Sequence, residues 1–203
     1  MSTLYYTRIK FILALLPLLT ASPLAGHAIS VYAGDMEHGN TIDPKNLPLG
    51  APADQKYSIN TVRQHVSFMK TFLFERLAAQ NAGKLRLTHI FPGLVEGPGF
   101  YSADNPVWFR VVWRLVKPIT RFYTTSSEDC GAAMVFLGTQ RFAAKGARME
   151  EVEAAKGTDG EVGGGAYAVG KTADVGGKVA YPAVRGGEVA QRVWEHTMKV
   201  LGM

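Results

Sequence analysis

The chain has 203 residues, of which 47% are hydrophobic and 19% charged, with 22 glycines and 10 prolines. This composition is typical of one globular domain and excludes a disordered or low-complexity chain. The formal net charge is +5, but the basic residues are interspersed with acidic ones, so we expect no nucleic-acid partner. The single cysteine, Cys130, excludes an internal disulfide, and the dispersed histidines predict no metal site.

The first predicted element is a helix over residues 4–20. Its apolar residues are spaced for one helix face, namely Ile9, Ile12, Leu13 and Leu16. The segment 8–28 also has the order of a secretory signal: basic, then apolar, then small residues. One hypothesis is therefore a secreted protein that is cleaved near Ala28. The other is an ordinary enzyme helix, followed by a strand at 28–32 that is too short to cross a membrane.

Helices and strands alternate through the next part of the chain. Residues 35–55 are rich in proline and glycine and predict a loop. From residue 57 to about 83 an amphipathic helix is expected, because apolar residues recur every three or four positions: Val62, Val66, Met69, Leu73 and Leu77. The β-friendly segment 84–91 then predicts a strand. This alternation indicates an α/β fold with a parallel sheet.

The remainder of the chain predicts less regular structure. Residues 98–118 are aromatic-rich with helical pieces, and residues 126–140 begin with a serine cap and predict a helix. Glycine-rich residues 165–184 predict an exposed hairpin, and residues 187–201 a last amphipathic helix. We therefore expect a main domain over 1–145 and a peripheral hairpin and helix over 146–203.

An ordered set of these segments resembles a known family. The set consists of "LLPLL" at the end of a helix, a strand, Tyr57-Ser58 at the start of a long helix, and a strand that ends in "HIFPGLV". It resembles the C-terminal half of a short-chain dehydrogenase/reductase of the fungal branch that is often found near secondary-metabolite pathways. The resemblance implies a partial Rossmann-like, doubly wound sheet without its N-terminal nucleotide-binding strands. It also implies an NAD(P)(H)-dependent oxidoreductase that interconverts carbonyls and alcohols.

The resemblance implies specific catalytic residues. In the family a tyrosine exchanges a proton with the substrate oxygen, and a lysine one helical turn later lowers the pKa of that tyrosine. Tyr57 matches the tyrosine, but Thr61 occupies the lysine position. The expected serine falls at Tyr32 or Ala33, and Ser30 is the nearest hydroxyl. The predicted catalytic residues are therefore Tyr57 and Ser30.

The resemblance also implies a cofactor contact. In the family a Pro-Gly turn approaches the nicotinamide, so Pro92, Gly93, Leu94 and Val95 are the predicted cofactor-binding residues. No glycine-rich dinucleotide motif follows a predicted strand. We therefore expect a truncated chain that binds NAD(P)(H) weakly and has little or no dehydrogenase activity alone.

A second hypothesis is a non-catalytic binding protein derived from this fold. Where strands of the family are missing, a sheet edge and apolar surface would attract a partner. We expect a small-molecule carbonyl or alcohol substrate, a cytoplasmic location, no membrane partner and a possible homo-oligomer. The sequence does not predict the substrate or the choice between NAD and NADP.

Overall fold

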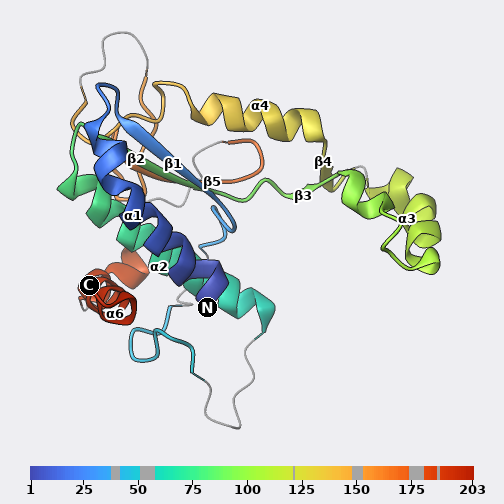
Figure 1. The fold of residues 1–203 in the computed structure, drawn as a ribbon, viewed down its shortest axis with the longest axis horizontal. Coiled ribbons are helices and arrows are strands. Elements are labelled where there is room, and N and C mark those ends of the chain that lie inside the picture. The colour runs from blue at the N-terminus through green and yellow to red at the C-terminus, as the bar shows by residue number, and fades with distance from the viewer. Residues whose placement is uncertain (38–41, 51–57, 121, 148–152, 174–180, 187) are drawn as a thin grey trace.

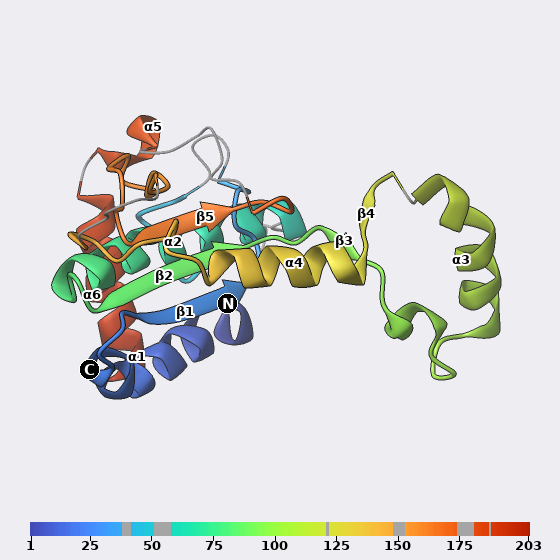
Figure 2. The same ribbon diagram turned by 90° about the horizontal axis from the view of Figure 1, so that it is seen from above.

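A parallel sheet forms the centre of the protein. The computed structural model describes residues 1–37, 42–50, 58–120, 122–147, 153–173, 181–186 and 188–203. The sheet has the strand order β1-β2-β5, formed by β1 (Gly26–Val31), β2 (Leu85–Ile90) and β5 (Ala166–Val169). Helices cover both faces of it (Figures 1 and 2). The predicted α/β class with a parallel sheet is confirmed.

Helix α2 (Ile59–Gln80) is the main support of the sheet. It begins at Ser58, whose side chain accepts a hydrogen bond from the backbone N–H of Thr61 and so caps the helix. All residues from 65 to 74 are buried, because the sheet, the N-terminal helix and α6 (Val189–Leu201) pack around α2. The predicted apolar stripe of α2 contributes Val66, Met69, Leu73 and Leu77 to this core.

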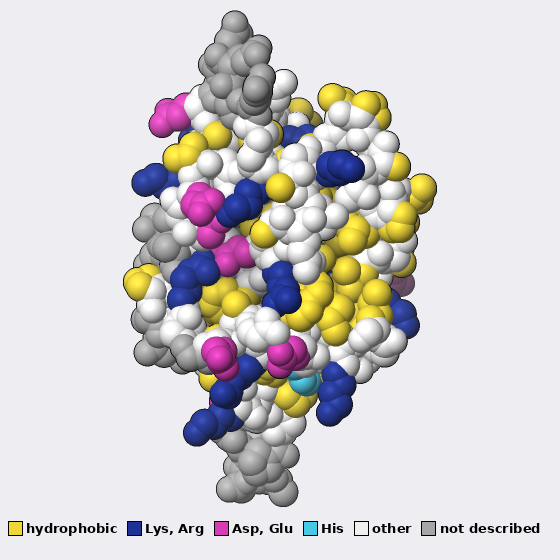
Figure 3. Space-filling view, turned by 90° about the vertical axis from the view of Figure 1, so that its left-hand side faces the viewer, with side chains coloured by type: hydrophobic (Ala, Val, Ile, Leu, Met, Phe, Trp, Pro, Cys, Tyr) yellow, Lys and Arg dark blue, Asp and Glu magenta, His cyan; other side chains and the backbone are white. Residues whose placement is uncertain are grey.

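The N-terminal helix consists of a π-helical turn, η1 (Ser2–Tyr6), and α1 (Thr7–Ala21). Ile9 and Ile12 are buried against the core, as their spacing predicts. Together the two parts are long and apolar enough to cross a membrane, and 17% of the most apolar window is buried. Core helices and signal sequences share these properties. Figure 3 views the molecule from one end, and hydrophobic side chains gather on one part of the surface seen there.

The opposite face of the sheet is covered by α4 (Ser127–Leu137), which begins at a capping serine, Ser126. Leu137 joins Phe142 and Tyr167 in a second buried cluster on this face. Strand β5 corrects the expectation of an exposed hairpin over 165–184. Its four residues are buried and pair in parallel with β2, because small and apolar residues between glycines suit a buried parallel strand. The second arm of that hairpin, 174–180, lies outside the described residues.

One part of the chain extends from the end of the sheet. Beyond β2, the chain forms β3 (Leu94–Val95), η2 (Pro98–Tyr101), α3 (Val107–Thr120) and β4 (Thr124–Thr125). Strands β3 and β4 pair in parallel over two residues each. Figures 1 and 2 both show α3 beyond the end of α4, away from the central sheet. A short helix, α5 (Pro182–Arg185), is held near α2 by an ion pair between Arg185 and Glu75.

The turn after β1 packs directly on backbone of the sheet, and this requires a glycine. A Cβ at Gly34 would overlap the carbonyl oxygen of His89 and lie 2.7 Å from that of Val169. We predict that Gly34→Ala lowers the free energy of unfolding by about 2–3 kcal/mol, because backbone atoms cannot move aside easily. Gly131→Ala is the control. It lies inside α4 with open space around it, so alanine should stabilise by about 0.5–1 kcal/mol. Urea denaturation of both variants tests this, and equal midpoints would contradict it.

Candidate functional site

A groove of about 530 Å³ runs between α1 and β1. Its lining is largely apolar, with Arg8 as the charged residue contributed by the helix. Strand β1 contributes residues 27–31, so Ser30 lies near the end of the groove at the carboxyl end of the strand. Ligands of open α/β sheets bind at the carboxyl ends of the strands, and this end of the groove is therefore the candidate site.

A buried lysine lies behind Ser30. Lys70 comes from α2, is fully buried, and its Nζ donates a hydrogen bond to Ser30 Oγ over 3.0 Å. The pKa of Lys70 is lowered to about 7, mainly by burial and also by the nearby charge of Arg8, while Glu37 acts in the opposite direction. The amine therefore changes charge near neutral pH, which is typical of functional lysines.

A tyrosine ring lies between two cations at the same place. The Tyr32 ring centroid is 4.9 Å from Lys70 Nζ and 5.6 Å from the guanidinium carbon of Arg8. Burial raises the pKa of the Tyr32 phenol, although Arg63 and Arg8 reduce this effect. The phenol oxygen is buried and has no hydrogen-bond partner among the described residues. Among the described residues, it is thus the polar atom of this cluster that lacks a hydrogen-bond partner.

A second buried polar cluster lies at the carboxyl ends of β1 and β2. His89 Nε2 lies 3.1 Å from Glu37 Oε1, and the hydroxyl of Thr71 donates to the same carboxylate oxygen over 2.9 Å. Burial would raise the pKa of Glu37, but the charge and hydrogen bond of His89, together with Thr71, outweigh it and hold this pKa below its usual value. The carboxylate is therefore ionised at neutral pH and contributes negative charge near Lys70.

The structure brings together some of the residues expected from the sequence. Ser30 lies in the site, hydrogen bonded to Lys70. Tyr57 lies outside the described residues, so its role stays a prediction. Thr61, at the position expected for the lysine, lies in the first turn of α2 and donates its backbone N–H to the capping hydroxyl of Ser58. His65 is buried and serves structure, since its Nδ1 accepts from the backbone of Asp43 and its Nε2 contacts the carbonyl of Leu47 over 3.0 Å.

The Pro92 to Val95 segment directly follows β2, also at the carboxyl end of the sheet. Gly93 has a φ of 80°, a conformation that favours glycine, and Thr125 Oγ1 donates to the carbonyl of Pro92 over 2.7 Å. Leu94 and Val95 then pair with β4. Nothing in this geometry tests the predicted contact with a cofactor.

Lys70 is the functional residue that sequence reasoning missed. A sequence signal exists, because Lys70 is one helical turn beyond Val66 and one turn before Leu73, on the apolar stripe of α2. A lysine at a core position of an amphipathic helix is rarely buried without a partner or a function. Glu37 carries no comparable signal, since it lies in an irregular segment.

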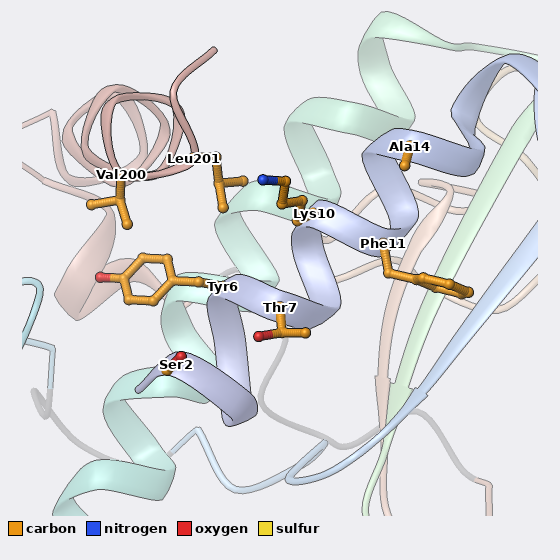
Figure 4. A pocket seen from close by; sticks show the side chains of 8 residues that line it. All are labelled: Ser2, Tyr6, Thr7, Lys10, Phe11, Ala14, Val200 and Leu201. Atoms are coloured by element: carbon orange, nitrogen blue, oxygen red, sulfur yellow. The ribbon is translucent and has the colours of Figure 1, made fainter.

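A second cavity, of about 480 Å³, lies between the N-terminal helix and α6 (Figure 4). Lys10 is its charged lining residue, and Tyr6 beside it hydrogen bonds His196 Nε2 over 2.7 Å. This lining contains no carboxylate and no buried amine, so it offers less chemistry than the groove at β1. Within the described ranges, no group of three His, Cys, Asp or Glu residues is placed to hold a metal ion.

Comparison with known proteins identifies relatives of the chain. It is 48% identical to the short-chain dehydrogenase/reductase SAT2 of Stachybotrys chartarum over 206 residues, which cover 98% of this chain and 57% of the relative. An oxidoreductase of Emericella nidulans is 31% identical over 97% of this chain and 59% of its own length. The oxidoreductase andH of Emericella variicolor is 28% identical over 96% and 58%. No family model and no solved structure matches the chain.

The chain has a parallel α/β sheet with a polar cluster at its carboxyl end, and the relatives are named as oxidoreductases. Over nearly its whole length the chain is similar to a short-chain dehydrogenase/reductase, which confirms the resemblance predicted from the sequence. It spans less than three fifths of the length of these relatives.

The buried amine should make stability depend on pH. The folded pKa of Lys70 is about 7 and its ordinary value is 10.5, so the unfolded chain binds more protons between these values and stability rises with pH across that window. We predict that Lys70→Met removes this rise and stabilises the protein at pH 7 by about 3 kcal/mol.

Urea denaturation at pH 7 and pH 9.5 provides the measurement. Lys10→Met, which removes an exposed lysine, is the control and should keep the pH dependence. A Lys70→Met variant whose stability follows the same pH curve as the unmodified chain would show that the amine is not neutralised by burial.

Proposed function

We propose that the chain acts as an NAD(P)(H)-dependent oxidoreductase of the short-chain dehydrogenase/reductase type on a small carbonyl or alcohol. The observation that carries this proposal is the cluster of Ser30, Tyr32 and Lys70 at the carboxyl end of β1. Serine, tyrosine and lysine are the residue types that the family uses. The relatives are named as oxidoreductases, which supports the same reaction class.

Each residue has a distinct role in this proposal. The Tyr32 phenol exchanges a proton with the substrate oxygen, since its own oxygen has no partner among the described residues. The Lys70 cation, 4.9 Å from the ring, lowers the cost of ionising the phenol. The Ser30 hydroxyl accepts from Lys70 and can donate to the same substrate oxygen. In the family the tyrosine lies one helical turn before the lysine, but here Val66 occupies that position relative to Lys70. The tyrosine of this site is therefore Tyr32, from the end of β1, and Tyr57 stays a second candidate.

The described residues fit a ribose of a nicotinamide cofactor, but they do not fit its pyrophosphate. Lys70 and Ser30 would hold ribose hydroxyls, and the bound cofactor would supply or accept the hydride. No described strand is followed by the glycine-rich turn that a pyrophosphate requires. We therefore propose that the 203 residues bind NAD(P)(H) weakly and are weakly active alone, as expected for part of a longer nucleotide-binding fold.

Calorimetry and prolonged turnover assays test the function. We predict millimolar binding of NADPH or NADH, and slow NADPH-dependent reduction of a panel of small carbonyls. Lys70→Met should lower this turnover at least 100-fold, because the proton donor loses its cation. Val135→Asp, on exposed α4 surface, is the control and should keep it. Micromolar cofactor affinity would overturn weak binding, and turnover that does not require Lys70 would overturn the proposed site.

The pH profile of this turnover should report the charge of Lys70. The cation is the active form in the proposal, so activity should fall as pH rises through about 7. Glu37 raises the pKa of Lys70, and Glu37→Gln should therefore shift the fall to lower pH. Glu195→Gln, on exposed α6, is the matched control. Identical profiles for Glu37→Gln and the unmodified chain would contradict this coupling.

A non-catalytic interaction protein is the second candidate, and the edge of the sheet favours it. In the described sheet β1 pairs on one side only, with β2, and Ile29 and Val31 on it are 37% and 45% exposed. Such an edge next to an apolar groove invites strand pairing with a partner or a second copy. Light scattering on the purified chain distinguishes the candidates, because we predict association for this function and a clean monomer would contradict it.

We also propose a cytoplasmic location and a role in fungal secondary metabolism. The helix at the start of the chain supports the first point, because Tyr5, Ile9 and Ile12 are buried in the same core cluster as residues of α2 and α6. A cleaved signal segment would leave that face of the core uncovered. The second point is supported by the fungal relatives.

A further inference from the structure

Helix α3 presents an apolar face that nothing in the described structure covers. Six large hydrophobic residues spaced at three or four positions share this face and are 46–72% exposed: Val107, Trp108, Val111, Val112, Leu115 and Ile119. Phe122 and Tyr123 follow the helix and are 82% and 77% exposed. Such a continuous exposed apolar surface is unusual on a soluble monomer and marks an interaction site.

The helix does not need this face for its own packing. Its opposite side carries Trp113, whose ring stacks on Phe100 of η2 with centroids 4.2 Å apart, and Phe109 lies beside it at 6.4 Å. This stack holds α3 against η2. Figures 1 and 2 show the helix apart from the central sheet, and the exposed fractions of its apolar side chains show that this face is open to solvent.

The charge of the segment distinguishes between kinds of partner. From residue 105 to residue 127 the sequence contains four basic residues, Arg110, Arg114, Lys117 and Arg121, and no Asp or Glu. Lys117 pairs with Glu96 over 2.6 Å, whereas Arg114 is exposed and lies in the helix beside the apolar face. A basic amphipathic helix with Trp and Tyr at its apolar face is the pattern that lies in the interface of a membrane.

We propose that α3 with Phe122 and Tyr123 is a peripheral attachment site for an anionic lipid surface. The apolar face would enter the boundary between headgroups and acyl chains, and Arg114 would lie at the level of the lipid phosphates. This proposal differs from the expectation of no membrane partner. The proposal does not depend on the oxidoreductase activity.

Co-sedimentation of the full chain with vesicles tests this site. Vesicles of phosphatidylcholine with 30% phosphatidylserine should bind at least tenfold more tightly than pure phosphatidylcholine vesicles. Leu115→Asp should weaken binding at least tenfold, because it places a charge at the centre of the apolar face. Arg114→Gln should weaken binding to the anionic vesicles about fivefold. Raising the salt concentration should weaken binding as well.

Matched variants on other helices serve as controls. Val135→Asp on α4 replaces a side chain that is 77% exposed, and Arg192→Gln on α6 removes an exposed charge. Both should bind as the unmodified chain does, and circular dichroism should show all four variants folded. The proposal is overturned by no binding to anionic vesicles, or by equal loss in the controls. It is also overturned if Leu115→Asp converts a dimer to a monomer and leaves vesicle binding unchanged, because the face would then join two copies.

Discussion

The burial of α2 on every side is the constraint on which the rest of the structure depends. Residues 65–74 are all buried. Besides His65, three of them carry polar groups that must be satisfied within the protein: Ser67, Lys70 and Thr71. Their partners are a backbone carbonyl, a serine hydroxyl and a carboxylate, all at the end of β1 or just after it. The helix therefore determines the path of the chain beyond β1 and gathers polar groups at the carboxyl end of the sheet. The same contacts of α2 therefore pack the core and form the candidate site.

The sequence predicted the elements whose burial is periodic and missed those defined by long-range contacts. The apolar stripe of α2 and the alternation with β1 and β2 were sufficient for the fold class. Strand β5 was misjudged because four buried residues between glycines show no alternation that separates a buried parallel strand from a hairpin arm. In the site, the resemblance placed the lysine at Thr61, one turn beyond Tyr57, whereas the buried lysine is Lys70. Glu37 was missed because irregular segments have no periodicity that reveals burial.

The polar cluster at β1 and the segment that follows β2 both lie at the carboxyl end of the sheet, but they differ in physical character. At β1 the polar groups are few, largely buried and coupled by charge, so a change in the charge of one should alter the protonation of the others. Beyond β2 the chain leaves the sheet after Gly93, and α3 is connected to the rest through the short pairing of β3 with β4. The stack of Phe100 and Trp113 and the ion pair of Lys117 with Glu96 hold that part together.

The contacts of α2 with the chain beyond β1 have a consequence for local opening. Thr71 holds Glu37, Ser67 holds the carbonyl of Ala33, and His65 holds the backbone at Asp43 and Leu47. The described parts of this loop are thus hydrogen bonded to one half of one helix. Releasing them breaks bonds that the helix needs to stay satisfied in its buried position. The loop and the first half of α2 should therefore open as one cooperative unit, with similar protection of their amides in hydrogen exchange, although most surface loops exchange far faster than the helices they cover.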